Sequence, residues 1–264
     1  MTEGILLFHP LDGQAVEALL CDADGNLFAS EEPAYEASAA VTNRLLAELD
    51  IDLAFDPPEL RRRAMGRNFR STAQLLAAEA GKEIDSASLE EWVLAERREV
   101  IAHLASVLEP DPEVDRPMRL LAGRFRVAVV SSSAQERLAA CFRATALEDL
   151  FPAPARFSAE DSLPVPTSKP DPAIYSFAGR QLGLLPAAAL AVEDAVVGAR
   201  SAIAAGFATV GNLQFVPADE RERRIADLRA AGVAAVVDSW SALAVLLGVA
   251  PDPQPPAQLI GDTT

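Results

Sequence analysis

An apolar run that ends in two carboxylates constrains the fold more than any other stretch of the chain. Residues Val16 to Cys21 are mostly apolar, and Asp22, Asp24 and Gly25 follow directly. Such a run predicts a buried strand of a parallel sheet, at about residues 16–22. Gly25 lets the chain leave the strand tip with a positive φ angle. Both carboxylates are therefore predicted at the carboxyl end of a strand, where open α/β sheets bind ligands.

The Asp-x-Asp-Gly pattern has other readings, because turns and calcium loops use the same residues. A calcium loop would need a glycine after a third ligand at Asn26, and a glutamate at its closing position. Leu27 and Phe28 follow Asn26 instead, and no glutamate closes the loop. The calcium loop is disfavoured, but a simple strand-end turn stays open on this motif alone.

Residues 30–108 read as helical, with no strand signal. Helices are predicted at 33–49, 58–64, 70–80 and from Ser88 to about Leu108, where Ser88 and Glu91 form a capping box. These residues predict a separate α-helical domain, inserted between the first strand and the rest of the chain.

Strands and helices alternate in the remainder. Strands are predicted at 127–130, 189–192, 208–210 and 234–237, with a weaker one near 156–157; helices are predicted at 114–123, 134–143, 173–182, 196–205, 218–230 and 240–247. This alternation predicts an α/β fold with a doubly wound, mostly parallel Rossmann-like sheet, formed by residues 1–29 and 109–250. The 30–108 insertion would be a cap over the strand tips. Residues 251–264 contain four prolines and predict a disordered tail.

Composition excludes several partners. The net charge is −16 over 264 residues, so no basic stripe could support nucleic-acid binding. No apolar run reaches membrane-spanning length, and the N-terminus lacks the basic region of a signal peptide. Two cysteines do not make a disulfide framework. We expect a soluble cytoplasmic protein, and the sequence predicts no oligomeric state.

Three predicted strands end in reactive groups: Asp22 and Asp24, then Ser131, then Glu193 and Asp194. Lys169 lies in a proline-rich loop before a helix. In a doubly wound sheet these ends converge on one crevice, where the carboxylates would repel one another unless a divalent cation held them. Oxygen ligands favour Mg²⁺, and a hydroxyl at a helix N-terminus with a lysine favours a phosphoryl group.

This set of motifs, in this order, resembles the haloacid dehalogenase-like superfamily, and most closely its phosphatases and phosphomutases with a helical cap after the first strand. The resemblance covers about residues 16–247 and rests on four motifs: Asp22-x-Asp24-Gly25, Ser131, Lys169-Pro170, and Glu193-Asp194-x-x-x-Gly198. Two positions depart from the common pattern. Asn26 stands where Thr or Val often follows the Asp-Gly, and Ala195 stands where a serine commonly follows the Glu-Asp pair.

The resemblance implies roles for these residues. Asp22 would be the nucleophile that forms an aspartyl-phosphate, and Asp24 the general acid and then base, with a raised pKa. Mg²⁺ would be held by Asp22, the backbone carbonyl of Asp24 and Asp194, with Glu193 as a ligand or a supporting group. Ser131 and Lys169 would hold the phosphoryl oxygens, with Ser132 a further substrate-binding residue.

Five arginines lie in the predicted cap: Arg61, Arg62, Arg63, Arg67 and Arg70. Such a group is usually a solvated helix face. In an acidic protein with a phosphate site, Arg67 or Arg70 could instead reach the substrate from the 66–70 loop.

The predicted function is a Mg²⁺-dependent phosphatase that acts on a small phosphorylated metabolite, possibly a sugar phosphate. A phosphomutase similar to β-phosphoglucomutase is the main alternative, but the cap histidine of those mutases is replaced by Ala34. Asp24 argues against a dehalogenase, whose members generally lack it, and the complete motif set argues against a non-catalytic binding protein.

Overall fold

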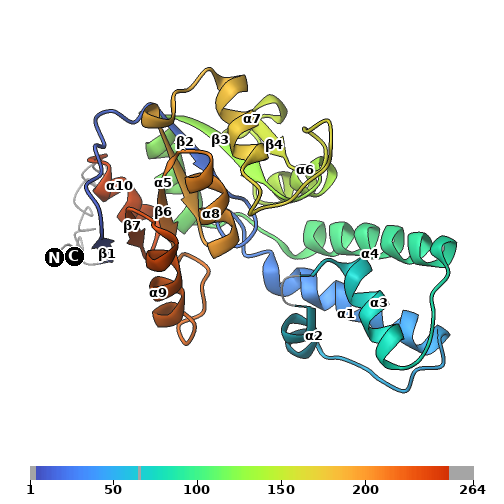
Figure 1. Ribbon diagram of the computed structural model, residues 1–264. Coiled ribbons are helices and arrows are strands. Elements are labelled where there is room, and N and C mark those ends of the chain that lie inside the picture. The colour runs from blue at the N-terminus through green and yellow to red at the C-terminus, as the bar shows by residue number, and fades with distance from the viewer. Residues whose placement is uncertain (1–3, 65–66, 250–264) are drawn as a thin grey trace, which may run out of the picture.

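The computed structural model describes residues 4–64 and 67–249 (Figure 1). In this part of the chain a seven-stranded sheet has the order β1-β7-β6-β5-β2-β3-β4. Its strands are β1 (Ile5–Leu7), β2 (Ala18–Cys21), β3 (Arg126–Ser131), β4 (Arg156–Ser158), β5 (Ala189–Glu193), β6 (Ala208–Asn212) and β7 (Ala235–Val237). Neighbouring strands pair in parallel except β1, which is antiparallel to β7. The predicted mostly parallel Rossmann-like α/β fold is confirmed.

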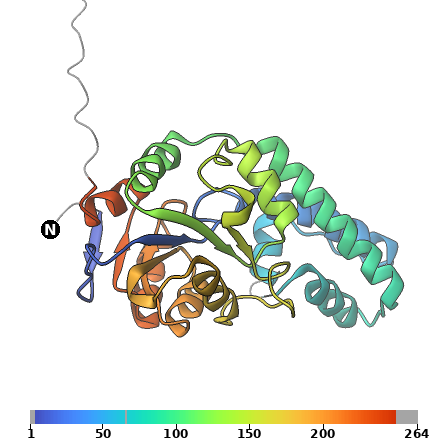
Figure 2. The same ribbon diagram turned by 90° about the horizontal axis from the view of Figure 1, so that it is seen from above.

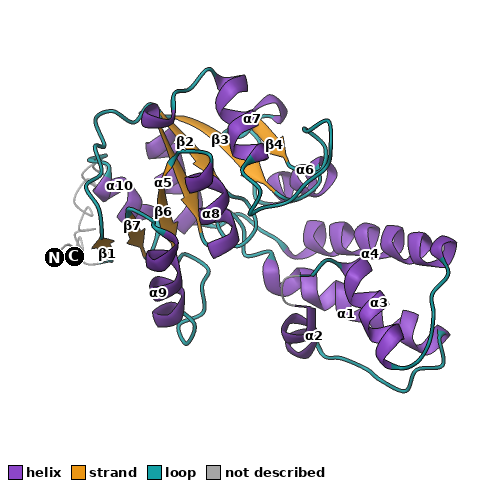
Figure 3. Ribbon diagram, in the orientation of Figure 1, coloured by secondary structure: helices purple, strands orange, loops and turns teal. Residues whose placement is uncertain are grey.

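Helices cover both faces of this sheet (Figure 3). They are α5 (Pro112–Ala122), α6 (Gln135–Ala144), α7 (Ala173–Leu182), α8 (Val196–Ala204), α9 (Arg221–Ala231) and α10 (Trp240–Leu246), with short 3₁₀ turns at Ala153–Ala155 and Pro186–Ala188. Alternate residues of β2 point to opposite layers, as strand geometry requires. Leu19 packs in a core with residues of α5, α6 and α10, whereas Leu20 packs with residues of α7 and α8.

Four further helices form a unit beside the sheet, at one end of the molecule (Figure 1). They are α1 (Glu31–Glu48), α2 (Pro57–Ala64), α3 (Phe69–Glu79) and α4 (Ser86–Val107). Small apolar clusters hold them together, for example Leu45 with Ala73 and Leu89. We call this the helical unit. Its α4 also lies along α6 of the sheet domain, as seen from above in Figure 2.

Two sequence-based expectations are wrong in detail. The sequence places the first strand at about residues 16–22, but Ile5–Leu7 form an earlier strand, β1. Leu6 and Leu7 are exposed on this edge strand, so no burial pattern signals it in the sequence. The start of α4 was expected at a Ser88–Glu91 capping box, but Asp85 is the N-cap, and its Oδ1 accepts from the Ala87 and Ser88 amides.

The tail expected at residues 251–264 lies outside the described residues. Within residues 4–64 and 67–249, no helix has both the length and the apolar character needed to cross a bilayer.

Candidate active site

The carboxyl ends of three adjacent strands bring the predicted reactive groups together. β2 lies between β3 and β5, with Cys21 in register with Val129 and with Val192. The Asp22 amide continues this ladder by donating to the Val192 carbonyl at 2.9 Å. Side chains that follow these strands therefore meet at one edge, as predicted for parallel strands.

Asp22, Glu193 and Asp194 form a buried acidic cluster, whose potential ligand atoms all lie within 4.8 Å of one another. Lys169, from the loop before α7, extends its side chain between two of these carboxylates. Its Nζ is 2.5 Å from Asp22 Oδ1 and 2.6 Å from Glu193 Oε1. Tyr175 also donates its hydroxyl to Glu193 Oε1. The Lys169 side chain is only 5% exposed, so these ion pairs are shielded from solvent.

The electrostatics of the cluster favour a bound cation. Burial and the neighbouring carboxylates raise the pKa of Asp194 well above its usual range. Burial also raises the pKa of Asp22, and that of Glu193 to about 7, although Lys169 opposes both shifts. Burial lowers the pKa of Lys169, but the two carboxylates outweigh it and raise that pKa. One lysine does not neutralise three carboxylates, so a divalent cation would relieve the remaining repulsion.

Two glycines let these carboxylates approach the backbone. Gly25 has a φ of 74°, and a Cβ there would lie 2.7 Å from Asp194 Oδ2. A Cβ on Gly198 would lie 1.8 Å from Glu193 Oε2. The glycines of the first and last motifs are therefore required by the acidic cluster, because any side chain would displace a carboxylate.

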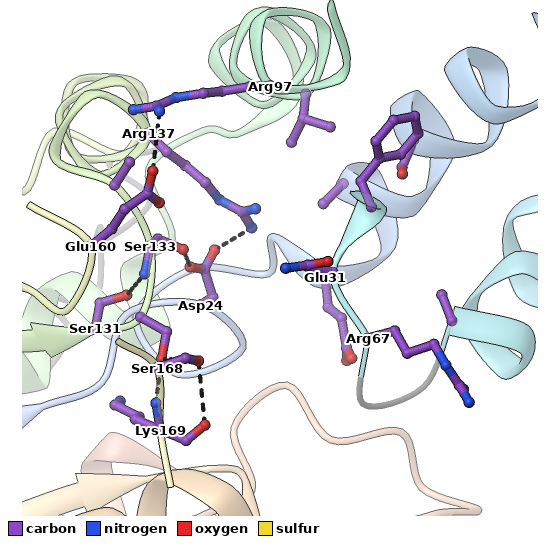
Figure 4. Close-up of a pocket in the computed structure, with 18 of the residues that line it drawn as sticks. Asp24, Glu31, Arg67, Arg97, Ser131, Ser133, Arg137, Glu160, Ser168 and Lys169 are labelled. Carbon is purple, nitrogen blue, oxygen red and sulfur yellow. Dashed lines mark hydrogen bonds and ion pairs between the residues drawn. The ribbon is translucent and has the colours of Figure 1, made fainter. Parts of the chain in front are cut away.

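Asp24 lies outside the cluster, among three side-chain donors, two of which, Ser133 and Arg137, are drawn in Figure 4. Ser30 Oγ and an Arg137 terminal nitrogen donate to its Oδ1 at 2.5 and 2.6 Å, and Ser133 Oγ donates to its Oδ2 at 2.6 Å. Burial alone would raise the pKa of Asp24, but Arg137 and the two serines outweigh it and lower that pKa. The expected raised pKa is therefore wrong for this arrangement, because the sequence motifs do not reveal Arg137.

The serines at the end of β3 and just after it connect parts of the site. Ser131 Oγ accepts from the Ser133 amide at 3.0 Å, and Ser132 Oγ accepts from the Lys169 amide at 3.2 Å. Ser132 thus connects the end of β3 to the loop that carries Lys169. Ser131, Ser132 and Ser133 all line the same cavity.

The two departures from the family pattern have different structural contexts. Asn26 is fully buried, and its amide nitrogen donates to the carbonyl of Asp22 at 3.2 Å and that of Val192 at 2.9 Å. Its side-chain oxygen accepts from Asn212 at 2.8 Å. Asn26 therefore supports the backbone on either side of the acidic cluster, at Asp22 and at Val192. Ala195 is the N-cap of α8 and provides no side-chain cap.

A cavity of about 970 Å³ extends from the strand tips to the helical unit. Asp22, Asp24 and Lys169 line it from the sheet side, and Tyr35 and Glu96 from α1 and α4. Both predicted cap arginines also line it, but neither guanidinium reaches the strand tips. Arg70 pairs with Glu90 at 2.6 Å, and Arg67 extends away from Asp24 in Figure 4.

Residues that no motif identified also hold the site. Arg224, on α9, donates to the Asp194 carbonyl at 2.6 Å and lies 3.6 Å from its carboxylate. Arg61, on α2, pairs with Glu220 at 2.8 Å and so connects the helical unit to the sheet domain. These contacts join segments far apart in the chain, and no local spacing predicts them.

The mostly parallel sheet, the acidic cluster and Lys169 describe an α/β protein with a candidate active site at its strand tips. A model of the haloacid dehalogenase-like hydrolases matches residues 16–206. Because the match covers well over half of the chain, the chain belongs to this family of hydrolases, as the motif resemblance predicted.

Individual relatives agree with this assignment. A CBBY-like protein of Arabidopsis thaliana is 43% identical over 56 residues, which are 21% of this chain and only 18% of that protein. A haloacid dehalogenase family hydrolase from Deinococcus radiodurans R1, solved with bound phosphate and sodium, is 26% identical, with a TM-score of 0.64 over 89% of this chain and 97% of that chain. CbbY from Rhodobacter sphaeroides, a mutant in complex with xylulose-(1,5)bisphosphate, is 23% identical, with a TM-score of 0.66 over 85% and 95%.

Proposed function

We propose that the protein is a Mg²⁺-dependent phosphatase that hydrolyses a small phosphorylated metabolite through an aspartyl-phosphate. The observation that carries this proposal is the acidic cluster of Asp22, Glu193 and Asp194, bridged by Lys169 at the end of a cavity of about 970 Å³. A hydrolase structure that is 26% identical was solved with phosphate bound, which supports an anionic substrate.

The donors of the cluster fit Mg²⁺, because they are buried hard oxygens with unbalanced negative charge. The proposed ligands are the carboxylates of Asp22 and Asp194 and the backbone carbonyl of Asp24. Glu193 stays a predicted ligand or supporting group; its Oε1 already accepts from Lys169 and Tyr175, which favours the supporting role. Bound Mg²⁺ would offset the repulsion between the nucleophile and the phosphate.

The first half-reaction is assigned to Asp22 and Asp24. An Asp22 carboxylate oxygen forms a bond to phosphorus while the bond from phosphorus to the ester oxygen breaks. Lys169 favours the ionised form of Asp22 through its 2.5 Å contact, and it would also attract the phosphoryl oxygens. Asp24 would donate a proton to the departing ester oxygen. A bound phosphate dianion opposes ionisation of Asp24 and so offsets the pKa lowering caused by Arg137.

In the second half-reaction Asp24 acts as the base. It accepts a proton from a water molecule, whose oxygen bonds to phosphorus as the bond from phosphorus to Asp22 breaks. Inorganic phosphate leaves and the Asp22 carboxylate is restored. Ser131 and Ser132, at the start of the loop before α6, are proposed to hold the phosphoryl oxygens.

The helical unit, residues 30–108, is proposed to act as the cap over residues 1–29 and 109–250. It provides a large share of the cavity wall, which is where the non-reacting part of the substrate would lie. A mutase is less well supported. Ala34, which replaces the histidine of β-phosphoglucomutase-like proteins, lines this wall and offers no side-chain donor.

Phosphate release tests the proposal. The panel contains hexose 1- and 6-phosphates, glycerol phosphates, phosphoglycolate and nucleoside monophosphates, each assayed with Mg²⁺ and then with a chelator. We expect Mg²⁺-dependent release from at least one compound, and no release by Asp22→Asn. Release that survives this substitution would reject the aspartyl-phosphate. Interconversion of hexose phosphates without release, in the presence of a bisphosphate activator, would identify a mutase.

A further inference from the structure

Arg137 is a residue of the cavity wall that contacts a proposed catalytic group directly, although no motif includes it. It lies on α6, and its terminal nitrogen is 2.6 Å from Asp24 Oδ1. Both side chains are 25% exposed, so the pair is partly shielded from solvent. Figure 4 shows the Arg137 guanidinium extending into the cavity towards Asp24.

The contacts around Asp24 define one orientation of its carboxyl group. Ser30 and Arg137 occupy Oδ1, and Ser133 occupies Oδ2. Ser133 is itself held, because its amide donates to Ser131 Oγ. The two serine hydroxyls can rotate to suit several carboxyl orientations, whereas the donors of a guanidinium form a rigid fork that lies in one plane. Of the three donors, Arg137 therefore restricts the orientation of the Asp24 carboxyl group most.

The helix that carries Arg137 is braced by the helical unit. α6 packs along α4, and Arg97 of α4 is 3.1 Å from Glu160 and 3.8 Å from Glu136, the residue before Arg137. The guanidinium thus projects into the cavity from the place where the helical unit meets the sheet domain.

We propose that Arg137 is a positioning residue that aims the Asp24 carboxyl group at the ester oxygen of the bound substrate. The inference rests on the proposed phosphatase function and deepens it, because it names a residue that the shared motifs do not contain. Arg137 itself transfers no proton and forms no bond; it acts through Asp24.

A positioning role predicts a dependence on the leaving group. An alkyl phosphate releases a basic alkoxide, so its cleavage needs a well-aimed proton donor. p-Nitrophenyl phosphate releases a weakly basic phenolate, so the alignment of Asp24 matters little to its first half-reaction. The second half-reaction is the same for both esters, and kcat/KM reports only the steps up to release of the leaving group. Loss of Arg137 should therefore lower kcat/KM much more for the first substrate than for the second.

The experiment compares Arg137→Leu and Arg137→Lys with wild type on p-nitrophenyl phosphate and on the best alkyl phosphate of the panel. For Arg137→Leu we expect kcat/KM to fall by about 10²-fold on the alkyl ester, the typical size of a general-acid contribution, and by under about 5-fold on the aryl ester. Arg137→Lys should recover part of the loss. The matched control is Arg143→Leu, which removes an exposed cation from the same helix and should leave both substrates unchanged.

Equal losses of kcat/KM on the two esters would overturn the inference, because they indicate a general structural role or a direct substrate contact. Failure of the proposed function looks different: wild type would then release no phosphate from either ester. A crystal structure of Arg137→Leu decides the matter even in that case. We expect the Asp24 carboxyl group to rotate or to lose its order, and an unchanged Asp24 would overturn the positioning role.

Discussion

The two ends of the cavity hold their charges in different ways. At the strand tips, Lys169 is 5% exposed and pairs with carboxylates from two separate strands. In the helical unit, Arg70 and Glu90 have side chains 39% and 58% exposed and pair with each other between neighbouring helices. The buried pairs are weakly screened, whereas exposed pairs contribute little to stability. Substitutions at the strand tips should therefore have far larger effects than substitutions of the arginines of the helical unit.

The largest effect is expected for Asp22→Asn. An amide is not a competent nucleophile, so kcat should fall by about 10⁴-fold or more. Steady-state phosphate release measures this, and Asp219→Asn, which changes an exposed carboxylate, serves as the control. Activity of Asp22→Asn within tenfold of wild type would remove Asp22 from the nucleophile role. It would also weaken the expectation that substitutions at the strand tips have larger effects than those in the helical unit.

Lys169→Met should affect both catalysis and stability. It leaves Asp22 and Glu193 buried without their cation, a change that typically costs about 3–5 kcal/mol. We also expect kcat to fall by about 10²–10³-fold, as for loss of one transition-state donor. Urea unfolding measures the stability, with the exposed Lys82→Met as control. Wild-type stability in Lys169→Met would show that the buried pairs contribute no more than surface pairs.

The pH dependence of stability tests the acidic cluster as a metal site. In the folded protein the pKa values of Asp22, Glu193 and Asp194 are raised above their unfolded values. The folded state therefore binds more protons, and its stability should fall as the pH rises towards and through about 7, the pKa of Glu193. In chelator, Tm should decrease between about pH 5 and pH 8.

Mg²⁺ should reverse this loss, because binding needs deprotonated ligands and stabilises only the folded state. The rise in Tm on adding Mg²⁺ should be larger at the higher pH, and Asp194→Asn should reduce it while Asp219→Asn does not. A Tm that Mg²⁺ leaves unchanged at both pH values would contradict a metal site in this cluster.

The sequence predicted the sheet end of the cavity well, for a physical reason. A parallel sheet brings the ends of its strands to one edge, so motifs more than a hundred residues apart, such as Asp22 and Lys169, can be placed together from topology alone. The strand positions are correct to within a few residues because fully buried strands have continuous apolar runs. Gly25 and Gly198 follow from the same motifs, and the structure adds the carboxylates that require them.

What could not be predicted depends on side-chain contacts between helices. Arg137 follows β3 on a helix with no distinguishing pattern, so its contact with Asp24, and the lowered Asp24 pKa, were not foreseen. Arg224 reaches Asp194 from α9 in the same way. In the helical unit, sequence alone identifies the arginines but not their partners, because a pair such as Arg70–Glu90 depends on how two helices pack.

Substitutions of Arg67 and Arg70 in the helical unit should have the smallest effects on kinetics. They test directly whether the two ends of the cavity differ in how they hold charge. Arg67 was predicted to bind substrate, and Arg67→Ala should then raise KM more than it lowers kcat. Its side chain extends away from Asp24, so we expect a rise in KM of only about 3-fold, the effect of a distant charge. Arg70→Ala should change neither parameter, since Glu90 already engages the guanidinium. Substrate titration of the two variants side by side measures the difference. A tenfold rise in KM for either variant would mean that the arginine leaves the position seen here to contact substrate. The helical unit would then bind the charge of the substrate, as is proposed for the sheet end of the cavity.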